Sequence, residues 1–260
     1  MHSKMPAALL LFIFTCCKNS NSQMHEHINV HKGNILQNES IYNDIAAIPV
    51  PAGYTRKEYP VNSFAMWLEK VKLKKSKTVY LFNGRKKTNQ SAQFAVLDIP
   101  VGNTDLQQCA DAVMRLRASW LFDEKKFDEI VFFDNGGGKY NFSAPYSLQN
   151  FNTYLKTVFN MCGTASLSRQ LKKINFKDIS AGDVLIRGGF PGHAVIVMDV
   201  VINKTGQKKY LLAQSYMPAQ DIHLLINPAD ANGMPWYDVT GADIIKTPEY
   251  IFHSNELKSW

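Results

Sequence analysis

The chain has 260 residues and a formal net charge of +7, from 29 lysines and arginines against 22 aspartates and glutamates. Hydrophobic residues make up 45% and charged residues 20%, which are ordinary globular values that exclude a disordered or fibrous chain. The positive charge permits a polyanionic partner but does not require one. No aromatic-basic motif supports nucleic-acid binding, so we expect none.

The first residues predict an export signal. An apolar run from Ala7 to Phe14 follows a short basic start and is too short to span a membrane. Cys16 and Cys17 come next, and an apolar run that ends at a cysteine resembles a bacterial lipobox. We expect residues 1–17 to be a signal peptide with Cys17, or alternatively Cys16, carrying a lipid. The alternative is an uncleaved apolar N-terminus.

The remainder divides into a tether and one domain. Residues 18–45 are polar and predict a flexible tether, and residues 46–260 predict a single α+β domain. The tether's histidines, His25, His27 and His31, are expected to be solvated, so we expect no metal and no cofactor. Cys109 and Cys162 of the domain either pair in a disulfide or leave a reactive thiol.

The predicted elements run in the order helices, then sheet, which is an α+β order. The first half predicts a short helix capped by Asn62 or Ser63, and a hairpin that pairs residues 79–82 with 93–99 around an Asn-Gly turn. The rest predicts a helix over 105–121, a strand over 130–133, helices within 147–173 and strands over 184–187, 193–202 and 209–215.

Cys109 is the candidate nucleophile. With Asp105 or Thr104 as the N-cap it lies in the first helical turn, where the helix dipole favours a thiolate. Val113, Leu116 and Trp120 share its helix face, so the same pattern also fits a small buried hydrophobic residue. Asp111 is expected to face away from Cys109, either as a surface group or as a group that supports the site without touching the substrate.

His193 and Gln214 are the candidate base and its orienting group. His193 begins a buried strand directly after a Gly-Pro-Gly turn, although a structural histidine fits this pattern as well. If the strands over 193–202 and 209–215 form a hairpin, Gln214 returns beside the His193 ring and fixes its tautomer. Ser215, Asp183 and Asp199 are rival orienting groups.

These segments together resemble known enzymes. Gln108-Cys109, Gly182-Asp183-Val184, Gly192-His193-Ala194 and Ala213-Gln214-Ser215 are similar in order to the papain-like CHAP and NlpC-type amidases. The resemblance implies an α+β fold with a papain-like core, in which a helix carrying the cysteine packs on an antiparallel sheet carrying the histidine. From about Ile48 to the C-terminus, the chain also resembles bacterial domain-of-unknown-function family 4846, which brings no established activity.

The papain-like resemblance implies an exported cysteine amidase or peptidase that cleaves an amide bond, with cell-wall peptide as the expected substrate. Cys109 would be the nucleophile, His193 the base and Gln214 the orienting group. The residues expected to bind the oxyanion or the substrate are Gln108, Arg115, Ser215 and His223. The expected partner is peptidoglycan or another amide-containing substrate. The protein would contact the membrane only through its lipid anchor. Its expected location is the bacterial envelope, either in the periplasm or anchored at the outer membrane. The alternative function is a non-catalytic envelope lipoprotein that binds a ligand or protein partner in the same cleft.

Overall fold

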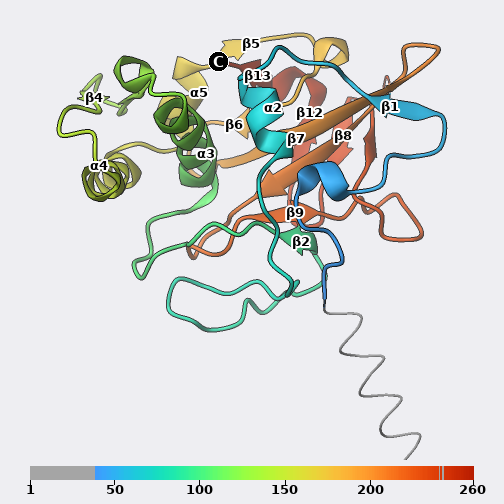
Figure 1. Ribbon diagram of the computed structural model, residues 1–260, viewed down its shortest axis with the longest axis horizontal. Coiled ribbons are helices and arrows are strands. Elements are labelled where there is room, and N and C mark those ends of the chain that lie inside the picture. The colour runs from blue at the N-terminus through green and yellow to red at the C-terminus, as the bar shows by residue number, and fades with distance from the viewer. Residues whose placement is uncertain (1–38, 240, 242) are drawn as a thin grey trace, which may run out of the picture. The chain divides into compact units, whose positions relative to one another are not determined.

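A computed structural model describes residues 39–239, 241 and 243–260 (Figure 1). The compact unit begins at Glu39, earlier than the predicted boundary at residue 46. Glu39 forms a β-bridge with Ser76, and Ile45 is fully buried in the core. Residues 39–45 therefore belong to the domain. The predicted signal peptide, the lipidated cysteine and the tether histidines lie outside the described residues.

A nine-stranded sheet dominates the described chain, and each of its paired strands is antiparallel. Its main path runs β2-β9-β8-β7-β6-β13-β5, while β1 pairs with β7 and β10 pairs with β8. The strands are β1 (Tyr54–Arg56), β2 (Gln93–Val96), β5 (Lys172–Lys173), β6 (Val184–Arg187), β7 (His193–Asn203), β8 (Lys208–Gln214), β9 (His223–Leu225), β10 (Tyr237–Asp238) and β13 (Leu257–Ser259).

Two small sheets and a few helices complete the described chain. The small sheets pair β3 (Val131–Phe133) with β4 (Lys139–Asn141), and β11 (Ile244–Lys246) with β12 (Ile251–His253). The α-helices are α2 (Phe64–Glu69), α3 (Cys109–Asp123), α4 (Leu148–Met161) and α5 (Thr164–Gln170). The 3-10 helices are η1 (Ile45–Ala47), η2 (Phe127–Glu129), η3 (Phe176–Asp178) and η4 (Ser254–Glu256). No helix in this part of the chain has the length and apolar character needed to cross a membrane.

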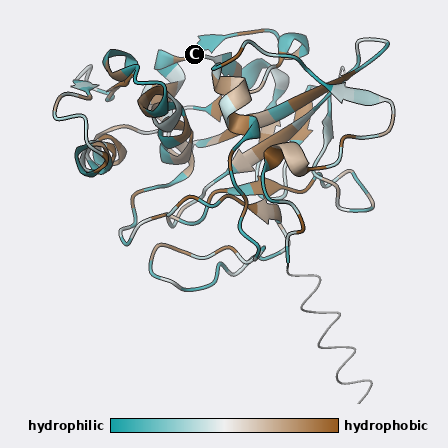
Figure 2. Ribbon diagram, viewed as in Figure 1, coloured by the Kyte–Doolittle hydropathy of each residue, from teal (hydrophilic) through white to brown (hydrophobic). Residues whose placement is uncertain are grey.

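The large sheet is buried on both faces, which explains the nearly continuous apolar sequence of β7. Ala194 and Ile196 belong to a core shared with the α-helices, whereas Val195 and Val197 belong to a second core with β12 and η3. Figure 2 shows the hydrophobic colouring of these central strands. His193 lies two residues before Val195, and side chains two residues apart in a strand lie on the same face. The His193 side chain therefore starts on the face away from the helices.

The predicted strands β6, β7 and β8 and the break between α4 and α5 near Gly163 are confirmed. The predicted hairpin of residues 79–99 is wrong. Its Asn-Gly turn exists, with Gly84 at φ +79°, but it closes only a narrow loop with a single Tyr80–Lys86 bridge. β2 pairs with β9 instead, from the other half of the chain.

The predicted fold class is also wrong. The described residues form a sheet-rich fold with four α-helices, not the papain-like core expected from the resemblance. We expected helices first and the sheet in the second half. The sheet instead draws strands from both halves, because β1 and β2 of the first half join it together with the unpredicted short strands β5, β10 and β13. At four residues or fewer, these strands are too short to show an alternating pattern.

Candidate functional site

Helix α3 begins at Cys109 itself, with Gln108 as its N-cap, rather than at Asp105 as predicted. The Gln108 backbone N–H donates to Asp111 Oδ2 at 3.0 Å, so the Asp111 side chain folds back toward the helix start. Asp111 is buried, so of its two predicted roles the surface one is wrong. The apolar face that follows Cys109 is buried as expected, which holds the first turn of α3 against the sheet.

The Cys109 thiol lies against the start of β7, beside the backbone amide of Ala194. Burial and the nearby Asp111 carboxyl raise the pKa of Cys109 to about 11, although the backbone N–H groups of Ala194, Ala110 and Cys109 act to lower it. The resting group is therefore a neutral thiol, and the thiolate expected from the helix dipole does not form. Cys109 and Cys162 are both free, so no disulfide joins them.

His193 lies at the first position of β7 and is almost completely buried. Its Nε2 and Gln214 Oε1 are 2.9 Å apart, as the hairpin of β7 and β8 predicted. The ring packs among aromatic side chains, with centroid distances of 4.6 Å to Tyr216, 4.9 Å to Tyr250 and 5.9 Å to Phe252. Burial lowers the pKa of His193 to about 4, so the imidazole is neutral at neutral pH.

Glu249 and Lys87 fix the orientation of the Gln214 amide. Gln214 Nε2 donates to Glu249 Oε2 at 2.7 Å, and the same oxygen pairs with Lys87 Nζ at 2.5 Å. Asn89 Nδ2 donates to Glu249 Oε1 at 3.0 Å. Burial acts to raise the pKa of Glu249, but the hydrogen bond and charge of Lys87 outweigh it and the pKa is lowered. The ionised carboxylate therefore only accepts hydrogen bonds.

The His193 tautomer follows from this orientation. Because the Gln214 amino group faces Glu249, Gln214 Oε1 faces His193 and must accept from a protonated Nε2. The lone pair of the neutral ring is then on Nδ1. Within the described chain, His193 Nδ1 has no hydrogen-bond partner. Its lone pair is therefore available to accept a proton.

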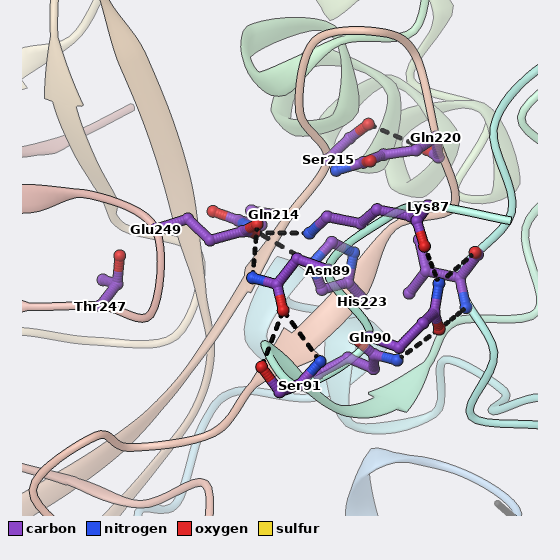
Figure 3. A network of polar contacts seen from close by, with 12 residues as sticks. Lys87, Asn89, Gln90, Ser91, Gln214, Ser215, Gln220, His223, Thr247 and Glu249 are labelled. Carbon is purple, nitrogen blue, oxygen red and sulfur yellow. Dashed lines mark hydrogen bonds and ion pairs between the residues drawn. The ribbon is translucent and has the colours of Figure 1, made fainter.

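His223 completes the same network with the opposite tautomer (Figure 3). Its Nδ1–H donates to the carbonyl oxygen of Asp221 at 2.9 Å, so its Nε2 carries the lone pair and faces Gln214 Nε2 at 3.4 Å. Burial lowers the pKa of His223 to about 4, and the ring is neutral. We refer to Lys87, His193, Gln214, His223 and Glu249 as the polar centre.

A model of the family described as Domain of unknown function (4846) matches residues 45–147 and 138–259. The chain belongs to this family. Comparison with curated proteins and with solved structures gave no match. The resemblance to papain-like CHAP and NlpC-type amidases is not supported by these findings. Membership of family 4846 carries no activity with it, so the chemistry of the site has to be argued from its own geometry.

The remaining predicted site residues occupy different positions. Ser215 Oγ donates to the carbonyl oxygens of Gln107 and Gln220, both at 2.9 Å, and so ties β8 to the segment before α3. Gln108 Nε2 donates to Asp105 Oδ1 at 3.1 Å and stays beside Cys109. Arg115 donates to Gln107 Oε1 at 2.7 Å and lines a separate cavity.

The two aspartates considered as rival orienting groups do not contact His193. Asp199 pairs with Arg56 Nε at 2.9 Å, and Asp183 Oδ2 accepts from the Ser180 backbone N–H at 2.7 Å. Asp199 therefore ties β1 to β7, and Asp183 fixes the turn that leads into β6. Gln214 is the group that meets the His193 ring.

Sequence reasoning missed Lys87, Asn89 and Glu249. Lys87 sits in a basic run and Glu249 in a Thr-Pro-Glu-Tyr turn, which are ordinary surface patterns. They are 162 positions apart in the chain, and nothing local to either residue indicates that they meet. Within the residues that the structure describes, no cluster of three or more His, Cys, Asp or Glu side chains could hold a metal.

The thiol and imidazole lie at the open end of β7 and β8. Cavities of about 540, 320 and 310 Å³ occur in the described chain, and other residues line all three. The loop that enters β7 and the loop that leaves β8 carry exposed apolar side chains, Phe190 at 92% and Met217 at 68% exposure. These two loops flank the strand end at which His193 begins β7 and Gln214 ends β8.

Proposed function

We propose that this chain is a cysteine hydrolase that cleaves an amide bond. Cys109 is the nucleophile, His193 the general base and Gln214 the group that orients His193. The observation that carries the proposal is the hydrogen-bond chain from Lys87 and Glu249 through Gln214, which leaves His193 Nδ1 as the basic nitrogen.

The thiol and the base lie at the same strand end. Cys109 meets the backbone amide of Ala194, the residue next to His193. No hydrogen bond joins Sγ to the imidazole in the described chain. The His193 side chain leaves β7 on the face away from the helices, whereas Cys109 begins α3 on the other face. The proposal therefore requires the thiol and the imidazole to meet around the end of the strand when substrate binds.

The reaction begins from a neutral thiol and a neutral imidazole. As Cys109 Sγ attacks the amide carbonyl carbon, the thiol proton moves to His193 Nδ1. Collapse of the tetrahedral intermediate breaks the C–N bond, and the proton passes to the departing amine. A water molecule then attacks the thioester carbonyl carbon and gives one proton to Nδ1. The C–S bond breaks, Nδ1 returns this proton to Sγ, and the carboxylic acid product leaves the regenerated thiol.

The backbone N–H groups at the start of α3 supply the charge stabilisation. The backbone amides of Cys109 and Ala110 are near enough to Sγ to lower the pKa of the thiol. When Sγ attacks the substrate carbonyl, the same amides can donate to the carbonyl oxygen as it becomes negatively charged. Gln108 stays beside them with one amino hydrogen held by Asp105, and its second hydrogen can reach the same oxygen.

The substrate class follows from the rim and from the N-terminal sequence. Exposed Phe190 and Met217 favour an extended chain with apolar side chains over a small polar molecule. The apolar run followed by Cys16 and Cys17 favours an exported lipoprotein of a bacterial envelope. Cell-wall peptide is the amide polymer of that compartment, and we propose it as the substrate.

Amine release from isolated peptidoglycan tests the activity. The wild type is expected to release free amino groups, detected by fluorescamine and assigned by mass spectrometry. Cys109→Ala is expected to lower the rate by about a thousandfold or more, because the nucleophile is removed. Cys162→Ala, the matched control at the end of α4, should leave the rate unchanged. Equal release by wild type and Cys109→Ala would refute the proposal.

A binding protein with an inert thiol is the second candidate. The raised pKa of Cys109 favours it, because a buried neutral thiol is unreactive until a base removes its proton. In that case the same strand end would hold a ligand or protein partner, and Cys109→Ala would leave that binding unchanged.

A further inference from the structure

A second candidate site lies in the cavity between the segment 100–107, α3 and α4. Its volume is about 310 Å³, and Arg115, Gln107 and Lys156 are the polar groups used below. Val101, Leu106, Leu155 and Phe159 supply its apolar walls. We call it the Arg115 cavity. It is separate from the polar centre, although Gln107 lies only two residues before Cys109.

Gln107, one of the lining residues, carries a buried hydrogen-bond donor that nothing in the described part of the protein satisfies. Gln107 is 1% exposed, and its Oε1 accepts from Arg115 Nη1 at 2.7 Å. This bond turns the amino group the other way, and Gln107 Nε2 is buried with no hydrogen-bond partner. An unsatisfied buried amide costs about 1–3 kcal/mol, so an acceptor in the cavity is favoured.

The cavity also has an excess of positive charge. Among the described residues, no carboxylate lies within 4.0 Å of Arg115, and its hydrogen-bond partner there is the neutral Gln107. Lys156 of α4 lines the same space. Burial alone lowers the pKa of Arg115 from its ordinary value. A half-buried guanidinium without an anion is a costly arrangement that a bound anion would relieve.

Size and lining define the anion. A planar carboxylate can accept from the Arg115 guanidinium donors that Gln107 does not occupy, in the geometry that guanidinium groups favour. The apolar walls suit a hydrocarbon body, and a volume near 300 Å³ is at the low end for small-molecule sites. We propose that the Arg115 cavity binds a small organic carboxylate with an apolar body, about the size of one N-acylated amino acid.

Calorimetry on the full chain tests this proposal with three probes: N-acetyl-L-leucine, N-acetyl-L-leucinamide and acetate. The carboxylate is expected to bind at least about tenfold more tightly than the amide, because it gains charge-assisted hydrogen bonds. It should also bind about tenfold more tightly than acetate, which lacks the apolar body. Equal binding of acid and amide, or of acid and acetate, would overturn the proposal. The measurement needs no hydrolysis, so it is independent of the proposed function.

Two variants locate the binding. Gln107→Glu places a carboxylate beside Arg115, which should fill the donor sites and weaken N-acetyl-L-leucine binding by more than tenfold while keeping the fold. Arg115→Gln removes the guanidinium and should weaken binding similarly. Arg85→Gln is the matched control, because Arg85 is exposed and does not line the cavity. Wild-type affinity in the folded form of either cavity variant would overturn the assignment.

Discussion

The polar centre lies on the sheet face away from the helices, whereas the Arg115 cavity lies between the segment 100–107, α3 and α4. In the polar centre, the Lys87 charge meets Glu249, and both hydrogens of the Gln214 amino group have acceptors. In the Arg115 cavity, the guanidinium has no carboxylate partner within the described chain, and Gln107 Nε2 has no acceptor. Every hydrogen-bonding group of the Gln214 side-chain amide has a partner, whereas the Gln107 side chain has a partner for its oxygen but none for its amino group.

Buried polar groups can serve two different roles, which are to position other side chains and to bind a molecule. A satisfied network holds each member in one orientation, and here it sets the tautomers of two histidines. An unsatisfied group keeps its hydrogen-bonding capacity for a molecule from outside. We therefore assign positioning to the first region and ligand binding to the second.

Removing the base from the polar centre has the largest expected effect. His193→Ala should lower hydrolysis of peptidoglycan by about 10²- to 10⁴-fold, because general-base catalysis contributes a factor of this size. His253→Ala is the matched control, since His253 is exposed and pairs with Asp243 away from the centre. Steady-state amine release measures both, and an unchanged rate in His193→Ala would contradict the assignment of the base.

The next largest expected effect concerns the rate at which the Cys109 thiol is alkylated. Alkylation by iodoacetamide requires the thiolate, and a pKa near 11 makes labelling of Cys109 at pH 7 about a hundredfold slower than for an ordinary thiol. The rate should rise about tenfold per pH unit toward pH 10. Peptide mapping by mass spectrometry follows Cys109, with Cys162 as the internal comparison because burial raises its pKa to about 12. Fast labelling at pH 5–6 would show instead a thiolate–imidazolium pair.

Neutralising Glu249 should loosen the polar centre. Glu249→Gln leaves Lys87 buried without a partner, which should lower the free energy of unfolding by about 2 kcal/mol. The new amide can donate as well as accept, so Gln214 loses its fixed orientation and the rate should fall about tenfold.

Two further measurements separate positioning from mere destabilisation in Glu249→Gln. The ¹⁵N shifts of the His193 ring should change from one tautomer to a mixture. Lys87→Met added to Glu249→Gln should restore most of the stability measured in urea, but not the single tautomer. An unchanged His193 spectrum in Glu249→Gln would contradict the role of Glu249.

The smallest effect is a gain in the Arg115 cavity. Gln107→Glu supplies the missing carboxylate and removes the unsatisfied amide, so the free energy of unfolding should rise by about 1 kcal/mol. Arg85→Gln should leave it unchanged. Urea unfolding measures both, and a loss of stability in Gln107→Glu would show that the cavity does not lack an anion.

The sequence predicts the centre of the sheet well and its edges poorly. β6, β7 and β8 are buried, rich in branched residues and bounded by glycines, so their limits are visible locally. β2 and β9 have four and three residues, and no local pattern reveals that they pair. The Asn83-Gly84 turn signal is real, but it closes a short loop instead of the predicted hairpin.

The same distinction applies to the candidate site. The contact between Gln214 and His193 follows from one hairpin, so local reasoning finds it. Lys87 and Glu249 meet only because the loop before β2 and the turn before β12 reach the same end of the sheet. The raised pKa of Cys109 was also missed, because the helix dipole is visible in sequence but burial and the position of Asp111 are not.

The pairing of β1 with β7 and of β2 with β9 has a consequence for how the chain folds. Each pair joins a strand from the first matched family segment to one from the second, so neither segment closes the sheet by itself. Such non-local contacts form late, because long loops must close before any pairing energy is gained. We expect slow refolding, on the millisecond-to-second scale typical of sheet proteins with high contact order, and a single cooperative transition shared by both polar regions.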